Sequence, residues 1–234
     1  MSTPQISWPI RRWAVLIAVV GTAVAVAVTV NLDRPPADDG LRAAAQHALT
    51  VLAGVPILAQ RPSRDDYQRT AFGAAWSDAV SVTGGGNGCD TRNDILARDL
   101  AEQTTGAVRS CPAAVLAGEF RSPYTGDHVT FRRDRAAGAV QIDHIVPLAY
   151  SWDMGAWSWP ARRRADFAND PANLVAVDAA SNQDKSDSEP ARWMPELSGF
   201  RCRYSVQFVE VSAGYGLSLD AGSVQVLHDA LEDC

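Results

Sequence analysis

IDHIVPL at residues 142–148, NDPANLV at 169–175 and SNQDKSD at 181–187 are the most informative segments of this 234-residue chain. Together they present an Asp-His pair, an Asn and a second Asn, in that order. We expect strands over 142–146 and 174–177 that form a hairpin. A helix over 178–185 would follow, with Asp178 as its N-cap.

The order of these side chains indicates a one-metal site for cleaving phosphodiesters. Such a reaction needs an activated water, charge relief on the phosphate and stabilisation of the leaving oxygen. A histidine can activate the water because its ordinary pKa lies near neutrality, and a divalent cation can supply the rest. Adjacent residues on a strand point to opposite faces, so Asp143 can coordinate the metal while His144 faces the water that attacks the phosphate.

The second Asn completes the predicted metal site. Asn182 would be a ligand through its amide oxygen, and oxygen ligands with several waters suit Mg²⁺, or Mn²⁺, better than Zn²⁺. Asn173 would either orient the His144 ring or hold the shape of the hairpin.

Lys185 is the only lysine of the chain, against 20 arginines. Its place beside the polar motif predicts that it neutralises phosphate charge near the transition state. The alternative is that Lys185 solvates a helix end, or pairs with Asp184 or Asp187.

These segments resemble the HNH endonucleases, whose ββα-metal core places a hairpin and one helix around a single divalent cation. The nine-residue step from Asn173 to Asn182 and the three-residue step to Lys185 fit that pattern. In the family Asp143 would be a metal ligand and His144 the general base. The chain departs from the eponymous pattern at Asn182, where many members carry a final His, and this departure bears on the choice of metal.

The flanking segments suggest a narrower relative. CDTRN at 89–93, PYTG at 123–126 and WMP at 193–195 are similar to small secreted HNH proteins allied to the C-terminal nuclease part of modification-dependent restriction enzymes. The resemblance covers residues 41–234 and is most specific in a core over 128–190. It implies an α+β fold in which helices surround a ββα-metal core.

The remaining pattern predicts mostly helices around that core. A further strand is expected over 128–133 and a turn over 136–138. An insertion over 150–167 holds Trp152, Trp157 and Trp159, which we expect to form a packing layer, the alternative being platforms on which bases stack. Helices are expected over 41–52, 65–80, 93–103, 112–120, 202–212 and 219–233.

The N-terminus predicts export. We expect residues 1–12, which contain Arg11 and Arg12, to be a cytoplasmic n-region. An uncharged run follows over 13–30, and residues 31–40 are expected to form a linker. At a helical rise the run reaches about 27 Å, just short of the ~30 Å hydrocarbon core. Its length leaves open a cleaved signal peptide and an uncleaved transmembrane anchor. Both place residues 41–234 outside the cell or in its envelope.

The four cysteines fit an oxidising compartment. Cys89, Cys111, Cys202 and Cys234 lack the spacing of a zinc knuckle or a redox motif, so two disulfides are expected. Three pairings are possible. We favour Cys89–Cys111 and Cys202–Cys234, because each joins neighbours around local helices.

Charge is the main objection to a nucleic-acid substrate. The net charge of −6 lacks the basic footprint that nonspecific binders usually show. However, arginine clusters at 132–135 and 162–164 flank the Asp-His pair, and a local positive field is what phosphate steering requires. The candidate phosphate contacts are Arg92, Arg132, Arg133 and Arg163, although Arg92 fits a salt bridge inside the fold equally well.

The sequence therefore predicts an exported, metal-dependent endonuclease that acts on DNA with little sequence preference. RNA stays open as a substrate, since no residue is seen to read a 2′-hydroxyl. Two other functions remain: a noncatalytic protein that binds nucleic acid or envelope on an HNH scaffold, and a metal phosphodiesterase for small substrates. The sequence predicts no protein partner, and a membrane contact only if the N-terminal segment is uncleaved.

Overall fold

The computed structural model describes residues 39–234, so the predicted signal or anchor over 13–30 lies outside the described residues. The chain separates into Met1–Asp39 and Gly40–Cys234, and the account below concerns the second unit. No helix within residues 39–234 combines the length and apolar character that crossing a bilayer requires.

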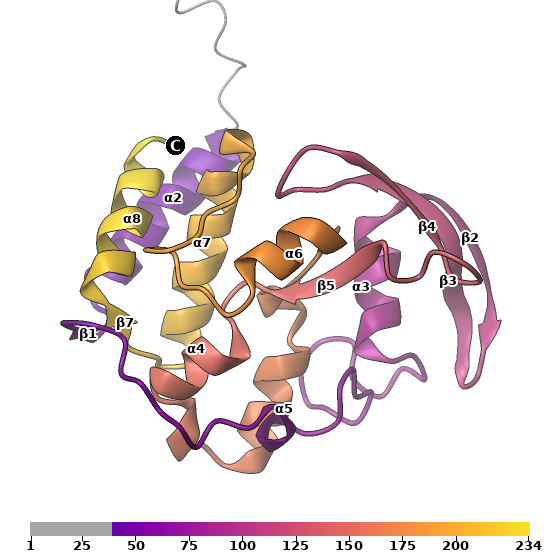
Figure 1. The fold of residues 1–234 in the computed structure, drawn as a ribbon, viewed down its shortest axis with the longest axis horizontal. Helices are drawn as coiled ribbons and strands as arrows, with labels where there is room; N and C mark the ends of the chain where they lie inside the picture. The colour runs from indigo at the N-terminus through magenta and orange to yellow at the C-terminus, as the bar shows by residue number, and fades with distance from the viewer. Residues whose placement is uncertain (1–38) are drawn as a thin grey trace, which may run out of the picture. The chain divides into compact units, whose positions relative to one another are not determined.

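A two-stranded hairpin and one helix lie at the centre of this unit (Figure 1). Strand β5 (Val140–His144) pairs antiparallel with β6 (Leu174–Asp178), and His144 lies opposite Leu174. Helix α6 (Ala179–Lys185) follows directly, because the Asp178 carboxylate accepts the amide of Ser181 at 2.8 Å and caps its first turn. The predicted hairpin, helix and N-cap are confirmed, as is the α+β class.

A three-stranded antiparallel sheet covers one side of the hairpin (Figure 1). Its order is β2 (Ala101–Val108), β3 (Cys111–Arg121) and β4 (His128–Arg132). Helix α3 (Thr91–Asp99) packs between β3 and β6. The apolar core shared by these elements includes Ile95, Leu96, Val115, Phe120, Phe131, Ile142 and Leu174.

The sheet confirms one prediction and corrects two. The strand predicted over 128–133 is β4. The helix predicted over 93–103 ends at Asp99, where the chain enters β2. The helix predicted over 112–120 is wrong, because this stretch is β3, paired on both edges, with Val115 and Phe120 buried. Strand pairing and burial override a sequence rich in alanine.

Helices form the other side of the unit. Helices α2 (Asp39–Leu52), α7 (Ser198–Gly214) and α8 (Ala221–Glu232) lie together (Figure 1), and they confirm three predicted helices. Strands β1 (Ile57–Leu58) and β7 (Leu219–Asp220) form a short parallel pair. Helices α4 (Leu148–Asp153) and α5 (Ala161–Asn169) and the 3₁₀ turns η2 (Ala156–Ser158) and η3 (Pro171–Asn173) connect β5 to β6.

The predicted helix over 65–80 is wrong. Only the 3₁₀ turn η1 (Arg69–Phe72) forms there, and Gly73 and Trp76 then adopt positive φ angles of 86° and 56°, which an α-helix cannot contain. The amide of Ser77 donates to the Asn169 side chain at 2.9 Å instead of to a preceding carbonyl. The segment is therefore a bent loop held against α5.

The tryptophan prediction holds for two of three residues. Trp152 is buried against Phe72, with ring centroids 6.1 Å apart, and Trp159 packs edge-on against Phe167. The exposed fraction of Trp157 is 49%, and the Arg64 guanidinium lies over its ring.

Both predicted disulfides are present. Cys89–Cys111 joins the loop before α3 to the start of β3, and Cys202–Cys234 joins α7 to the C-terminal residue. The bonds close chain segments of 22 and 32 residues. Each loop restricts the unfolded chain and stabilises the fold by about 3 kcal/mol.

We predict that replacing Cys202 and Cys234 by serine lowers the melting temperature by about 6–12 °C, since roughly 3 kcal/mol corresponds to that shift in a domain of this size. Calorimetry with and without reductant measures it. The result contradicting the disulfide assignment is four titratable thiols in the native, unreduced protein.

We also predict that the Asp178 cap stabilises the fold mainly above pH 4. Burial alone would raise the pKa of this carboxyl group, but hydrogen bonds from Ser122 and Ser181 hold the pKa below its ordinary value. A lowered folded pKa gives stability that is present above the unfolded pKa and is lost as pH falls through the folded value. Asp178→Ala should cost about 1 kcal/mol at pH 7. Urea unfolding should show this difference shrinking towards pH 2, and a difference independent of pH would argue against the carboxylate as its source.

Candidate active site

Asp143 and His144 end strand β5, and both are buried. One carboxylate oxygen of Asp143, Oδ2, accepts a hydrogen bond from the Tyr124 hydroxyl at 2.5 Å and lies 2.8 Å from the Lys185 ammonium. No donor within residues 39–234 meets the other oxygen, Oδ1. The protein therefore fixes Oδ2 of this carboxylate, and Oδ1 is available to a ligand.

Lys185 is completely buried at the end of α6. Its ammonium donates to the main-chain carbonyl of His144 at 2.8 Å as well as pairing with Asp143. Burial lowers the pKa of this amine, and the Asp143 carboxylate opposes that effect.

The predicted contact of Lys185 with a phosphate does not fit this placement. The ammonium is fully buried, and Lys185 does not line the pocket that Asp143 and His144 share. The alternative pairing with Asp184 or Asp187 is not formed either. Lys185 instead ties the C-terminal end of α6 to the end of β5.

The His144 ring is held in one tautomer. Its Nε2 lies 2.9 Å from the Ala168 carbonyl, which can only accept, so Nε2 carries the hydrogen and Nδ1 keeps its lone pair. The Trp76 indole lies parallel to the ring, with centroids 5.8 Å apart. Burial lowers the pKa of His144 to about 4. The imidazole is consequently neutral at pH 7 and able to accept a proton at Nδ1.

Asn173 shapes the chain immediately after β5. Its Oδ1 accepts the amide of Val146 at 2.8 Å, and its Nδ2 donates to the Val146 carbonyl at 3.2 Å. Of the two roles expected for Asn173, these contacts favour holding the hairpin over orienting the His144 ring.

Asn182 has one amide atom fixed and one free. Its Nδ2 donates to the Gln141 side chain at 2.6 Å, which leaves Oδ1 without a protein partner in the described part of the chain. Asn182 lines the same pocket of about 540 Å³ as Asp143 and His144. The pocket thus collects two free oxygens, from Asp143 and Asn182, of the kind that Mg²⁺ and Mn²⁺ prefer. The side chains present therefore fit a divalent cation.

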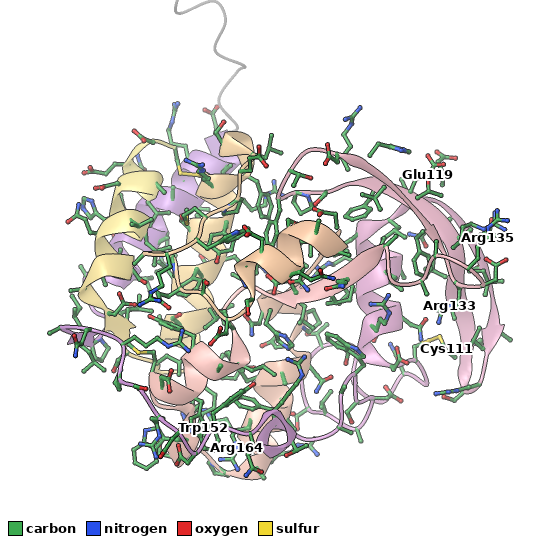
Figure 2. The ribbon with its side chains drawn as sticks, viewed as in Figure 1. Cys111, Glu119, Arg133, Arg135, Trp152 and Arg164 are labelled. Atoms are coloured by element: carbon green, nitrogen blue, oxygen red, sulfur yellow. A yellow bond between two sulfur atoms is a disulfide. The ribbon has the colours of Figure 1, made fainter. Side chains whose placement is uncertain are left out.

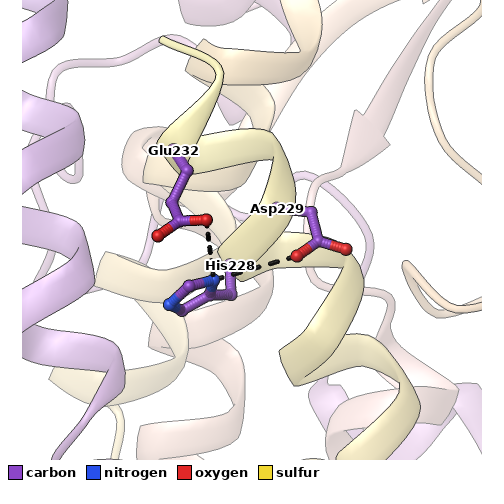
Figure 3. Close-up of side chains that lie close together, drawn as sticks. All are labelled: His228, Asp229 and Glu232. Carbon is purple, nitrogen blue, oxygen red and sulfur yellow. Dashed lines mark ion pairs between the residues drawn. The ribbon is translucent and has the colours of Figure 1, made fainter.

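Another histidine-carboxylate group lies on α8 (Figure 3). His228 is 3.8 Å from Asp229 and 3.6 Å from Glu232, and all three side chains are exposed. These are ion pairs between neighbours on a solvated helix.

The arginines predicted to contact phosphate bind other parts of the fold. Arg92 donates to the Ala137 and Val140 carbonyls, each at 2.9 Å. None of the four lines the pocket that contains His144. Arg133 donates to the Val115 carbonyl at 2.8 Å, and Arg163 donates to the Tyr215 carbonyl, also at 2.8 Å. Arg132 lies 3.5 Å from the Asp134 carboxylate.

Figure 2 shows arginines at two places in the fold. Arg133 and Arg135 lie on the side of the three-stranded sheet, and Arg164 lies beside Trp152, its guanidinium 5.5 Å from the ring centroid.

Sequence reasoning missed four residues of the site. Tyr124 and Gln141 hold the two predicted ligands, Trp76 covers His144, and Arg69 is the exposed arginine that lines the pocket. PYTG at 123–126 was a signal for Tyr124. Arg69 and Trp76 were hidden by the wrong helix over 65–80.

A hairpin bearing Asp-His, followed by a helix bearing Asn, defines an HNH-type nuclease domain. The family model for the C-terminal domain of GmrSD restriction endonucleases matches residues 90–218, which is more than half of the chain. The chain belongs to this family.

A protein of Arthroderma benhamiae, described as an uncharacterized secreted protein, is 34% identical over 221 residues, covering 93% of this chain and 98% of that protein. No solved structure matches significantly.

We predict that amine-reactive reagents leave Lys185 unmodified in the native protein, because its ammonium is buried and paired with Asp143. In denaturant the same reagent should acylate Lys185 fully, and mass spectrometry of peptides distinguishes the two. A small lysine-containing peptide added to both samples is the control, since its amines should react in both conditions. Complete native acylation of Lys185 would show that the ammonium is exposed in solution.

Proposed function

We propose that this protein is an exported, metal-dependent endonuclease that hydrolyses phosphodiester bonds of DNA with little sequence preference. One observation carries the proposal. Asp143, His144 and Asn182 line a single pocket, and each has one polar atom held by the protein and one left free. The free atoms are two oxygens for a cation and one basic nitrogen for a water.

Each of these side chains has a defined part in the reaction. Asp143 and Asn182 would hold Mg²⁺ or Mn²⁺, which when bound polarises the phosphoryl oxygen and stabilises the leaving oxygen. His144 would take a proton from the attacking water at Nδ1. The Ala168 carbonyl keeps Nε2 protonated and stabilises the imidazolium as it forms.

Three further residues support this chemistry. Arg69 is exposed at the pocket and would contact the phosphate, taking the role expected of Lys185. Lys185 and Tyr124 position the Asp143 carboxylate. Burial, and then the Asp143 charge, raise the pKa of Tyr124 well above its ordinary value, so the hydroxyl remains a donor.

The substrate and the compartment rest on separate support. The family to which the chain belongs is named for restriction endonucleases, which favours DNA over RNA. Export is supported by the charged and apolar N-terminus, by the two disulfides and by the secreted relative. The net charge of −6 fits a substrate held at one pocket more than along a broad basic surface.

The test is cleavage of circular plasmid by purified protein in Mg²⁺ or Mn²⁺, with loss of cleavage in EDTA. His144→Ala should reduce the rate by about 10²–10⁴-fold, the usual contribution of a general base. DNA binding measured in Ca²⁺ at low salt should change little. His228→Ala is the matched control, because this histidine lies on the exposed face of α8, and it should cut like wild type.

A plasmid that is not cleaved in the presence of either metal would contradict the endonuclease proposal. If a small diester such as bis(p-nitrophenyl) phosphate is then still hydrolysed, the protein is a phosphodiesterase for small substrates. Binding of DNA without hydrolysis of either substrate would instead indicate a noncatalytic protein. A His144→Ala variant that retains more than a few per cent of activity would exclude His144 as the base.

A further inference from the structure

A second pocket, of about 290 Å³, adjoins the first, and most of the residues that line it have no role in the chemistry proposed above. It shares Arg69, His144 and Leu148 with the first pocket, so the two spaces meet around the His144 ring. Its other walls come from residues 70–76 and from the end of α5. The space therefore begins beside the group that would activate the water.

The walls of this pocket are mainly apolar. Phe72, Leu148 and Ala168 contribute aliphatic or aromatic surface, and the Trp76 indole lies parallel to His144 at the boundary. An apolar cavity of roughly 150 Å³ accommodates a benzene ring, so the larger volume suits a flat system of one or two rings. Apolar walls with a few polar groups are the usual form of a small-ligand site.

Three donors without an acceptor lie along one segment of the wall. Thr70, Ala74 and Ala75 line the pocket, and within residues 39–234 no acceptor meets the Thr70 hydroxyl or the main-chain amides of the two alanines. Such donors can bind the ring nitrogens and exocyclic oxygens of a heterocycle. A flat ring with polar edges is the shape and chemistry of a nucleobase.

The segment that forms this pocket is held in place without a ligand. The positive φ angles of Gly73 and Trp76 bend it, and the Asn169 side chain accepts the amide of Ser77 directly after it. Arg164 also donates to the Ala71 carbonyl at 2.8 Å. The pocket lies mostly outside residues 90–218, which the family model matches, so it is built largely by the N-terminal flank of this chain.

We propose that this pocket binds the nucleobase next to the scissile phosphodiester, taken out of the base stack, so that an unpaired nucleotide is the preferred site of cleavage. The inference rests on the proposed nuclease function, which places a phosphate in the adjoining pocket. A base is joined to its phosphate through a single sugar, as two pockets sharing Arg69 and His144 require. Taking a base out of the stack costs least where it is mismatched or single-stranded.

The experiment uses single-stranded oligonucleotides with one cleavable phosphodiester, all others being methylphosphonates. The nucleotide on one side of that bond is either thymidine or an abasic tetrahydrofuran, and each side is tested in turn. Removing the base on one side should slow wild-type cleavage by about 5- to 150-fold, the usual contribution of stacking a base on aromatic side chains. The same bond within a matched duplex should also be cut more slowly than in the single strand.

A pair of variants assigns the effect to the pocket. Ala75→Trp fills it, and the ratio of the rates with and without the base should fall towards one. Ala79→Trp adds the same side chain at an exposed position of the same loop that does not line the pocket, and the ratio should persist. Thermal melting confirms that each variant is folded. If Ala75→Trp does not fold, the wild-type ratio and the duplex comparison decide the question alone.

The outcomes separate this inference from the function on which it rests. Equal rates with and without the base on either side, or faster cleavage of the duplex, overturn the base pocket and leave the nuclease standing. Loss of the ratio in Ala79→Trp as well would overturn the assignment to this pocket. No cleavage of any substrate, plasmid included, removes the nuclease function and the inference together.

Discussion

The ion pair between Asp143 and Lys185 is the interaction on which the site depends. It joins the end of β5 to the end of α6, and these two elements carry both predicted metal ligands. Removing one partner of a buried pair typically costs about 3–5 kcal/mol, because the other charge is left without compensation. The same contact fixes Oδ2 of Asp143 and leaves Oδ1 free, so the proposed cation site would share this interaction with the stability of the hairpin.

The neighbouring contacts repeat this pattern of one atom held and one atom free. Ala168 holds Nε2 of His144, and Gln141 holds Nδ2 of Asn182. In each case the fixed atom sets the orientation of the side chain before any substrate arrives. In the proposed reaction such a site would need little reorganisation, and this preorganisation is the main source of electrostatic stabilisation in enzymes.

The sequence predicted the hairpin, α6 and the Asp178 cap because these features depend on neighbouring residues. It failed over 65–80 and 112–120, where distant contacts decide the structure: Asn169 takes the amide of Ser77, and pairing with β2 and β4 extends β3. Arg92, Arg133 and Arg163 illustrate the same limit. Arg133 and Arg163 flank the Asp-His pair in the sequence, yet the guanidinium groups of all three residues bind carbonyls elsewhere in the fold.

The burial of the only lysine also determines how the surface of this protein reacts. Every other basic side chain apart from the histidines is an arginine, whose guanidinium remains protonated and is a poor nucleophile. Lysine amines attack reducing sugars, aldehydes and activated esters, and the one lysine amine of this chain is buried. Aldehyde fixation and sugar-derived browning, which cross-link most proteins through lysine, therefore find no exposed lysine on the described part of this chain.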